Sequence, residues 1–203
     1  ALHAIGQGAF PVPVYFIGAG LSTLPAVLAD ASSYAERLYR FYSLDLLDPV
    51  ASRKAYVEPT DRVGITWEEG ALSEALDAAR GYPYFIQQCG YCICEQLDAP
   101  SVVSASDALE GIALAQAELD SGLYRSRWDR ATPNGRAMMR VMADQEGPYR
   151  MSDIARKMGK DTSGGLSVLR DRLITDGLIF SPERGYVDFT VPGMAGFIRR
   201  HAE

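Results

Sequence analysis

Residues 150–190, RMSDIARKMGKDTSGGLSVLRDRLITDGLIFSPERGYVDFT, decide the fold of this chain. Ser152 can cap a short helix, because its hydroxyl can accept a hydrogen bond from the free amides of the first turn. Gly159 suits the end of that helix. A second helix, opening at Thr162 or Ser163, places three leucines at i, i+3 and i+7 on one face: Leu166, Leu169 and Leu173.

Two strands follow the second helix and complete a recognisable order of elements. Residues 178–180 and the alternating residues 186–190 predict a hairpin, joined by the turn SPERG at 181–185. A helix over residues 133–145 precedes the whole stretch. The order helix, helix, turn, helix, hairpin predicts a winged helix-turn-helix domain over residues 132–203.

The charge is distributed unequally between the two parts of the chain, whose formal net charge is −6. Residues 1–124 carry 6 Lys and Arg against 16 Asp and Glu, whereas residues 125–203 carry 14 against 10. This asymmetry favours an anionic partner at the C-terminal end and argues against nucleic acid on the first half. The alternative is that the arginines simply form solvated helix surfaces.

The bulk composition indicates a folded cytoplasmic protein. Hydrophobic residues make up 47% of the 203 residues, enough for a substantial core. The longest apolar runs fall well short of the ~18 residues of a membrane span. The N-terminus lacks the pattern of a signal peptide and opens within an element, so we expect the chain to be part of a longer gene product.

The N-terminal residues predict a small α/β segment. Residues 12–17 are an apolar run typical of a buried parallel strand, residues 24–39 have a helical pattern, and residues 40–44 are a second strand candidate. Two strands cannot form a stable parallel sheet, so their edges and apolar faces need further partners. We therefore expect self-association through residues 1–44.

The middle of the chain, residues 45–120, predicts a helical bundle. Asp48-Pro49 opens a helix that should end at residues 58–59, and a capping box at residues 66–69 opens another that ends near Arg80. An almost wholly apolar helix over residues 84–97 should lie at the centre of the bundle. Ser104 caps a helix to about residue 119, and residues 120–131 resemble a linker. The expected fold class is therefore mainly α with a small α/β segment.

No catalytic or metal-ligating constellation is evident. On a helix, Cys94 is rotated by about 200° from Cys92, so Cys89, Cys92 and Cys94 cannot hold one ion, and we expect reduced core cysteines and no metal site. The motif GxxxxGK[ST] does not occur in the sequence, so these residues hold no phosphate loop.

Several segments together resemble the C-terminal part of bacterial AAA+ ATPases related to the STAND and origin-recognition-initiator clades. They are VPVYFIGAGLSTLP at 12–25, residues 40–44, GYPYFIQ at 81–87 and FTVPG at 189–193. The resemblance covers nearly the whole chain. It implies the end of a P-loop ATPase core at residues 1–44, a helical lid at 45–120 and a C-terminal winged helix, with residues 12–17 as the fourth core strand.

The resemblance also implies which residues face a nucleotide. Ser22 or Thr23 lies near the position that senses the γ-phosphate, and Gly81 and Pro83 match the start of the lid helix and act as a hinge. The arginine of that helix is missing, and Arg80, just before the turn, is a candidate substitute. ATP and Mg²⁺ are therefore expected in the intact parent protein, not in these residues alone. As alternatives, Ser22 and Thr23 cap a helix, and residues 81–83 form an ordinary turn.

The winged helix predicts phosphate contacts rather than base readout. The outward face of its second helix is poor in the side chains that read base edges: Gly164, Ser167, Val168, Asp171 and Thr175. Four cations could still contact the phosphates of double-stranded DNA: Lys157, Lys160, Arg172 and, at the wing tip, Arg184. The alternative is a non-catalytic module that binds a protein partner or regulates one.

Overall fold

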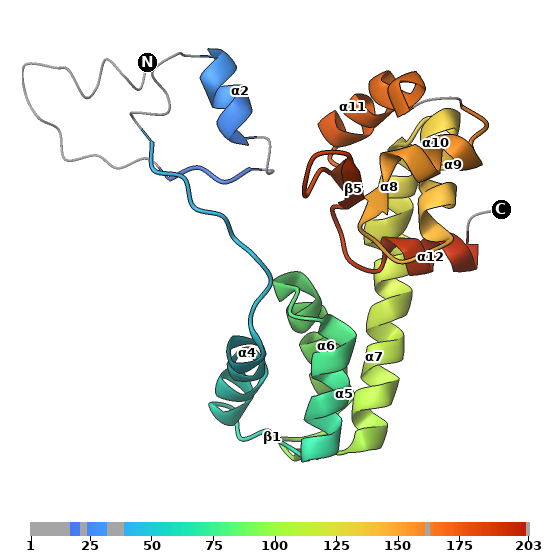
Figure 1. The fold of residues 1–203 in the computed structure, drawn as a ribbon. Helices are drawn as coiled ribbons and strands as arrows, with labels where there is room; N and C mark the ends of the chain where they lie inside the picture. Colours follow the sequence, from blue (N-terminus) through green and yellow to red (C-terminus); the bar gives the residue numbers. More distant parts are fainter. Residues whose placement is uncertain (1–16, 21–23, 32–38, 161–162, 202–203) are drawn as a thin grey trace, which may run out of the picture. The chain divides into compact units, whose positions relative to one another are not determined.

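The computed structural model describes residues 17–20, 24–31, 39–160 and 163–201 (Figure 1). The chain divides into two units, Ala1–Ser43 and Leu44–Glu203. The described residues are mainly helical, with a few short strands. None of the helices in these ranges is both long and apolar enough to cross a membrane.

The first unit contains one described helix, α2 (Leu24–Ala31), within the helix predicted over residues 24–39. The first predicted strand lies almost entirely outside the described residues; its last residue, Ile17, is 97% exposed. The second predicted strand, residues 40–44, is wrong, because this segment is irregular and Leu44 is 93% exposed. A strand needs a partner for its backbone groups, and in the described ranges nothing pairs with this segment.

The second unit begins with a helical bundle. Its elements, with the short parallel pair β1–β2 between them, are α4 (Pro49–Asp61), β1 (Thr66–Trp67), α5 (Glu69–Ala79), α6 (Pro83–Glu95), β2 (Val102–Val103) and α7 (Ala105–Leu119). Helices α6 and α7 approach closely at Gly111, where an added Cβ would lie 2.5 Å from the Cα of Ile93. Leu72 of α5 and Ile86 and Ile93 of α6 are completely or almost completely buried in the bundle.

The ends of the bundle helices follow the predicted capping chemistry in part. Asp48 accepts a hydrogen bond from Ala51 N at 2.7 Å, as predicted. The expected end at residues 58–59 is wrong, because α4 continues through Pro59 to Asp61. The capping box at residues 66–69 is also wrong: Thr66 pairs with Val102 in β1–β2, and Glu68 precedes α5 without a side-chain cap.

The predicted helix starting after Ser104 is present, but the predicted linker after it is not. Ser104 and Asp107 form a reciprocal capping box at the start of α7. Residues 120–130 continue α7 without a break as a π-helical turn, η1 (Asp120–Tyr124), and α8 (Arg125–Arg130) (Figure 1). Tyr124 and Trp128 are 1% and 4% exposed. This segment is therefore a packed helix and part of the core.

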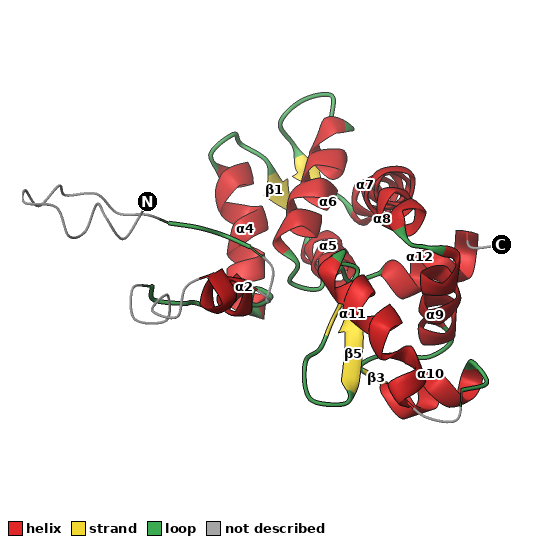
Figure 2. Ribbon diagram, turned by 90° about the horizontal axis from the view of Figure 1, so that it is seen from above, coloured by secondary structure: helices red, strands yellow, loops and turns green. Residues whose placement is uncertain are grey.

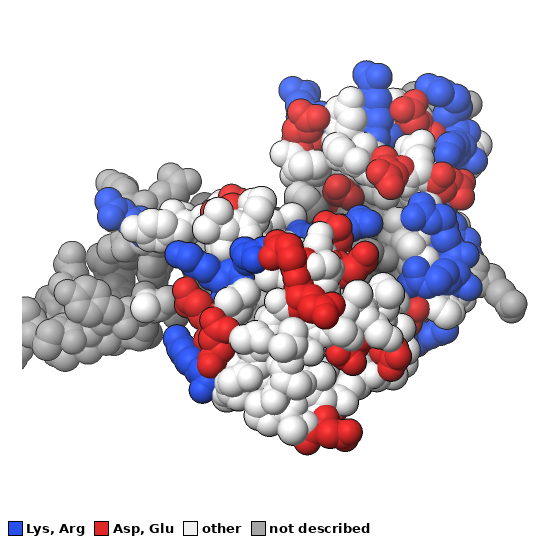
Figure 3. Space-filling view, turned by 90° about the horizontal axis from the view of Figure 1, so that it is seen from below, with Lys and Arg blue, Asp and Glu red and all other residues white. Residues whose placement is uncertain are grey.

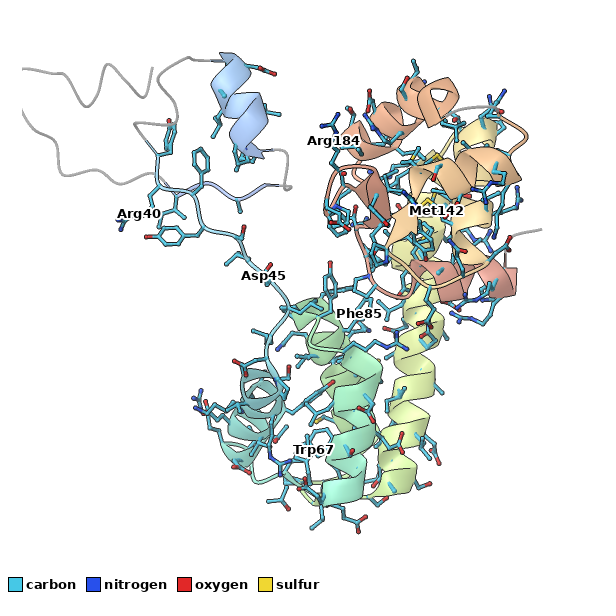
Figure 4. The ribbon with its side chains drawn as sticks, viewed as in Figure 1. Arg40, Asp45, Trp67, Phe85, Met142 and Arg184 are labelled. Atoms are coloured by element: carbon cyan, nitrogen blue, oxygen red, sulfur yellow. The ribbon has the colours of Figure 1, made fainter. Side chains whose placement is uncertain are left out.

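Tyr124 connects the bundle to the C-terminal part of the chain. Its ring lies 6.2 Å from that of Phe85 in α6 and stacks at 5.6 Å on Phe197 near the C-terminus. Its hydroxyl donates to Pro192 O at 2.8 Å. Phe85 lies at the end of the bundle that meets this junction, opposite the end that carries Trp67 (Figure 4).

The C-terminal part has the predicted order of helices and hairpin. Its elements are α9 (Pro133–Ala143), β3 (Tyr149–Arg150), α10 (Met151–Lys157), η2 (Ser163–Leu166), α11 (Ser167–Thr175), β4 (Ile179–Phe180), β5 (Tyr186–Phe189) and α12 (Met194–His201). The strands form an antiparallel sheet in the order β3-β5-β4, of which β3 and β5 are labelled in Figure 2. Met138, Met139 and Met142 of α9 are completely buried and form the centre of this part.

Helices α10 and α11 agree with the sequence prediction except at the start of α10. Helix α10 begins at Met151 after Arg150, without a side-chain cap, so the predicted cap by Ser152 is wrong. Gly159, with φ of 68°, follows the helix as expected. Leu166, the last residue of η2, is 3% exposed, and Leu173 of α11 is 1% exposed. Leu169 packs partly buried against the same core, so the predicted burial of the three leucines is confirmed.

The buried hydroxyl of Tyr124 yields a stability prediction. Tyr124→Phe keeps the ring but leaves Pro192 O without its donor, so we expect the free energy of unfolding to fall by about 1–2 kcal/mol. Urea denaturation followed by circular dichroism measures it. Tyr91→Phe, at an exposed position of α6, is the matched control and should change the free energy little. Equal values for the two variants would show that the Tyr124 hydrogen bond adds nothing.

Candidate functional site

The residues expected to face a nucleotide are only partly described. Ser22 and Thr23 lie outside the described residues. Arg80 is exposed at the end of α5, and its backbone adopts the left-handed conformation, with φ of 49°. Gly81, with φ of 73°, is buried, and Pro83 is the first residue of α6.

The backbone of Leu47 packs against Gly81. Leu47 N donates to Gly81 O at 2.8 Å, and a Cβ on Gly81 would lie 2.5 Å from Leu47 O. The glycine is thus required for the close approach of the segment that enters the bundle. Arg80 remains as the one charged side chain among the described candidates, so these residues do not by themselves fit an ATP site.

The four predicted phosphate contacts differ in their partners. Lys157 Nζ lies 3.8 Å from Asp144, and Arg172 Nε lies 3.7 Å from Asp176. Lys160 and Arg184 are exposed and form no ion pair within the described part of the chain. Arg184 projects from the β4–β5 turn, away from the core around Met142 (Figure 4).

The outward face of α11 carries little net positive charge. Arg170 pairs with Asp171 at 2.7 Å, and Arg172 pairs with Asp176 one turn later. Val168 on this helix is 83% exposed. This face therefore presents an apolar side chain between neutralised charges, in agreement with the sequence expectation that it lacks base-reading groups.

A larger group of cations, which the sequence analysis did not single out, lies on three helices packed at the junction. We call it the arginine surface: Arg125, Arg127 and Arg130 of α8, Arg136 and Arg140 of α9, and Arg199 and Arg200 of α12. Lys and Arg side chains gather at one side of the face shown in Figure 3. The signal in the sequence was five arginines between residues 125 and 140.

Aromatic rings and carbonyls hold several of these arginines in place. The guanidinium groups of Arg136 and Arg140 lie 5.5 and 5.0 Å from the centre of the Trp128 ring. Arg125 lies 5.5 Å from the centre of the Phe197 ring. Such cation–π contacts help to fix the long side chains, and Arg136 also pairs with Asp129 at 3.6 Å.

Asp120 ties the end of α12 to η1. It accepts hydrogen bonds from Arg200 at 2.9 Å and from Gln116 at 2.8 Å, and it lies 2.8 Å from His201 Nε2. Burial raises the pKa of Asp120, but the hydrogen bonds from Arg200, His201 and Gln116 together outweigh it and hold the pKa below its ordinary value. The carboxylate thus links the bundle helix to the C-terminal helix.

The cysteines do not form a reactive or metal-binding group. Cys89 and Cys92 are buried, and Cys94 is half-buried. Burial raises the pKa of Cys89 to about 11, which disfavours the thiolate. Within the described ranges, no three His, Cys, Asp or Glu side chains are placed to hold a metal ion.

Comparison with known protein families finds a match to the C-terminal part of the chain. Residues 121–198 match a family described as a domain of unknown function (DUF8462). No curated protein matches the chain. The matched segment begins within η1 and ends within α12, so it takes in α8 together with the helices and hairpin that follow.

The packing of Gly81 yields a prediction. Gly81→Ala places a methyl group against Leu47 O and adds left-handed strain, so we expect a loss of at least about 2 kcal/mol in the free energy of unfolding. Gly70→Ala in α5 is the matched control. Its Cβ meets nothing within 4 Å, and we expect a gain of about 0.5–1 kcal/mol. A neutral Gly81→Ala would contradict the close approach of Leu47.

The Asp120 contacts predict a pH-dependent stability. Because the folded-state pKa is depressed, Asp120 contributes stability above its ordinary pKa of 3.8, which is lost as the pH falls through the folded value. Asp120→Asn should lose about 1–3 kcal/mol at pH 7, and its difference from the wild type should shrink below pH 3.8. Denaturant titrations at pH 7, 5 and 3 measure this; a difference constant with pH would contradict it.

Proposed function

We propose that this chain is the C-terminal region of a cytoplasmic AAA+ ATPase of the STAND and initiator-like kind. In this proposal α4–α7 are the lid and residues 132–203 are a winged helix that contacts double-stranded DNA. Residues 1–44 belong to the ATPase core. ATP and Mg²⁺ are held in the intact protein by a phosphate loop and an acidic strand that these 203 residues do not contain.

The observation that carries the DNA contact is the order of elements from α9 to β5. A helix, a short strand, two helices and a hairpin, with the three strands in one antiparallel sheet, are the parts of a winged helix. Arg184 at the hairpin turn and Lys160 after α10 are exposed cations at two edges of this arrangement. Both suit phosphate oxygens rather than base edges.

The proposed coupling of lid and winged helix rests on the continuous α7–η1–α8 helix. Phe85 of the lid and Phe197 of α12 both contact Tyr124 of η1. Asp120, also in η1, forms an ion pair with Arg200 of α12. A movement of the lid in this arrangement carries the winged helix with it, since no flexible segment lies between them in the described chain. Gly81 and Pro83 stand at the start of α6, where the lid would turn.

A second candidate function is a non-catalytic module that binds or regulates a protein. The observation that favours it is Val168, which is 83% exposed on α11 between the paired charges of Arg170–Asp171 and Arg172–Asp176. An exposed apolar side chain on an otherwise neutral face fits a protein surface better than a phosphate backbone.

The DNA contact yields a binding prediction. Lys160→Glu with Arg184→Glu reverses two exposed charges, so we expect the affinity for a mixed-sequence duplex to fall at least about 10-fold and the salt slope to decrease by about 2. Fluorescence anisotropy titrations at about 50 and 150 mM added salt measure the affinity and the salt slope. Asp171→Asn with Asp176→Asn should strengthen binding. Unchanged affinity and slope in the charge-reversed variant would contradict the hairpin contact and favour the protein-binding module.

A further inference from the structure

The positive charge of the C-terminal half is concentrated away from the proposed DNA-contacting elements. Residues 150–190 carry seven Lys and Arg against six Asp and Glu, so they are nearly neutral. Helices α8, α9 and α12 carry seven Arg against one acidic residue of their own, Asp129, which pairs with Arg136; Asp120 of η1 pairs with Arg200. An electrostatically bound polyanion is therefore attracted to the arginine surface more strongly than to α11 and the hairpin.

The arginine surface is already ordered before a partner binds. Arg136 donates to Trp128 O and Asp129 O at 3.0 Å, and Arg199 donates to Ala143 O at 2.7 Å. A guanidinium group has five N–H donors, so one or two such bonds leave further donors for a ligand. Arg127 Nε is buried and has no hydrogen-bond partner among the described residues. Preordered arginines lose less side-chain entropy when they bind an anion.

The chemistry of this surface fits nucleic acid better than an acidic protein. Helices α8, α9 and α12 contain arginine and no lysine, and the planar guanidinium group matches two phosphate oxygens at once. None of the large hydrophobic side chains exposed in the described chain lies on these helices. Protein interfaces are usually centred on apolar anchors, whereas nucleic-acid interfaces are polar and strongly positive.

We infer that the arginine surface of α8, α9 and α12 binds the phosphate backbone of duplex DNA, independently of sequence, as the principal electrostatic contact of this chain. The inference rests on the proposed DNA binding and places its main contact on a different surface. DNA then lies across the junction of bundle and C-terminal part, where Tyr124 and Asp120 join them. The hairpin residue Arg184 is an additional contact, and the exposed Val168 face of α11 stays free.

The test compares charge-neutralised variants of the whole 203-residue chain. Arg125→Gln with Arg130→Gln removes two exposed charges from α8 and keeps long side chains. Lys54→Gln with Arg62→Gln removes two exposed charges, one in α4 and one at its C-terminal end, and is the matched control. Arg125→Lys with Arg130→Lys retains the charge. Thermal melts establish that each variant is folded, and anisotropy of a labelled duplex at several salt concentrations gives the affinity and the salt slope.

The α8 glutamine variant should bind DNA about 10-fold or more weakly at 100 mM salt, with a slope smaller by about 2. The α4 variant should bind like the wild type, and the α8 lysine variant should keep most of the slope. Wild-type binding by the α8 glutamine variant would overturn the inference. So would displacement of the duplex by poly-L-glutamate at equal charge concentration, which would assign the surface to acidic proteins.

The charge-reversed hairpin variant, Lys160→Glu with Arg184→Glu, separates this inference from the proposed function. Loss of binding only in the α8 variant supports the arginine surface and removes the hairpin contact. Loss only in the hairpin variant overturns the arginine surface and leaves the proposed winged-helix contact in place. Loss in both variants supports both surfaces, whereas absence of binding by the wild type at low salt overturns both.

Discussion

The structure of residues 44–203 depends on the packing of Tyr124 between two groups of helices. Its ring contacts Phe85 of the bundle and Phe197 of α12, and its hydroxyl is satisfied by Pro192 O. Gly193 is required beside it, because a Cβ there would collide with the Tyr124 hydroxyl. Burial of a large aromatic side chain with its polar end satisfied is among the stronger contacts in a small protein.

The position of Tyr124 is set by the π-helical turn that carries it. In η1 the amide of Arg125 donates to Asp120 O, five residues earlier, so the helix gains an extra residue in that turn and changes phase. The same turn presents Asp120 to Arg200 and His201. One short segment therefore supplies an aromatic contact and an ion pair to the same partner helix, which explains how bundle and C-terminal part are joined.

Arginine side chains gather at this junction. Arg136 and Arg140 of α9 pack on the buried ring of Trp128, and Arg125 of α8 packs on Phe197. Their aliphatic stems add to the hydrophobic packing. The same side chains thus contribute to stability and to the inferred anion contact. Two arginines of this surface, Arg136 and Arg200, pair with aspartates, as do both arginines of α11.

The sequence by itself determined the elements whose signals are local. The leucine face of α11, the caps at Asp48 and Ser104 and the hairpin of residues 179–189 follow from side-chain periodicity and capping chemistry, which act within a few residues.

Only the tertiary structure decided the rest. Thr66 is part of a strand because Val102 lies beside it. Residues 120–130 form a helix because Tyr124 and Trp128, four residues apart, are both buried in the core. The close approach of Leu47 to Gly81 also joins distant residues, and the arginine surface exists because α8, α9 and α12 pack together. Such contacts join residues distant in the chain, so no local pattern contains them.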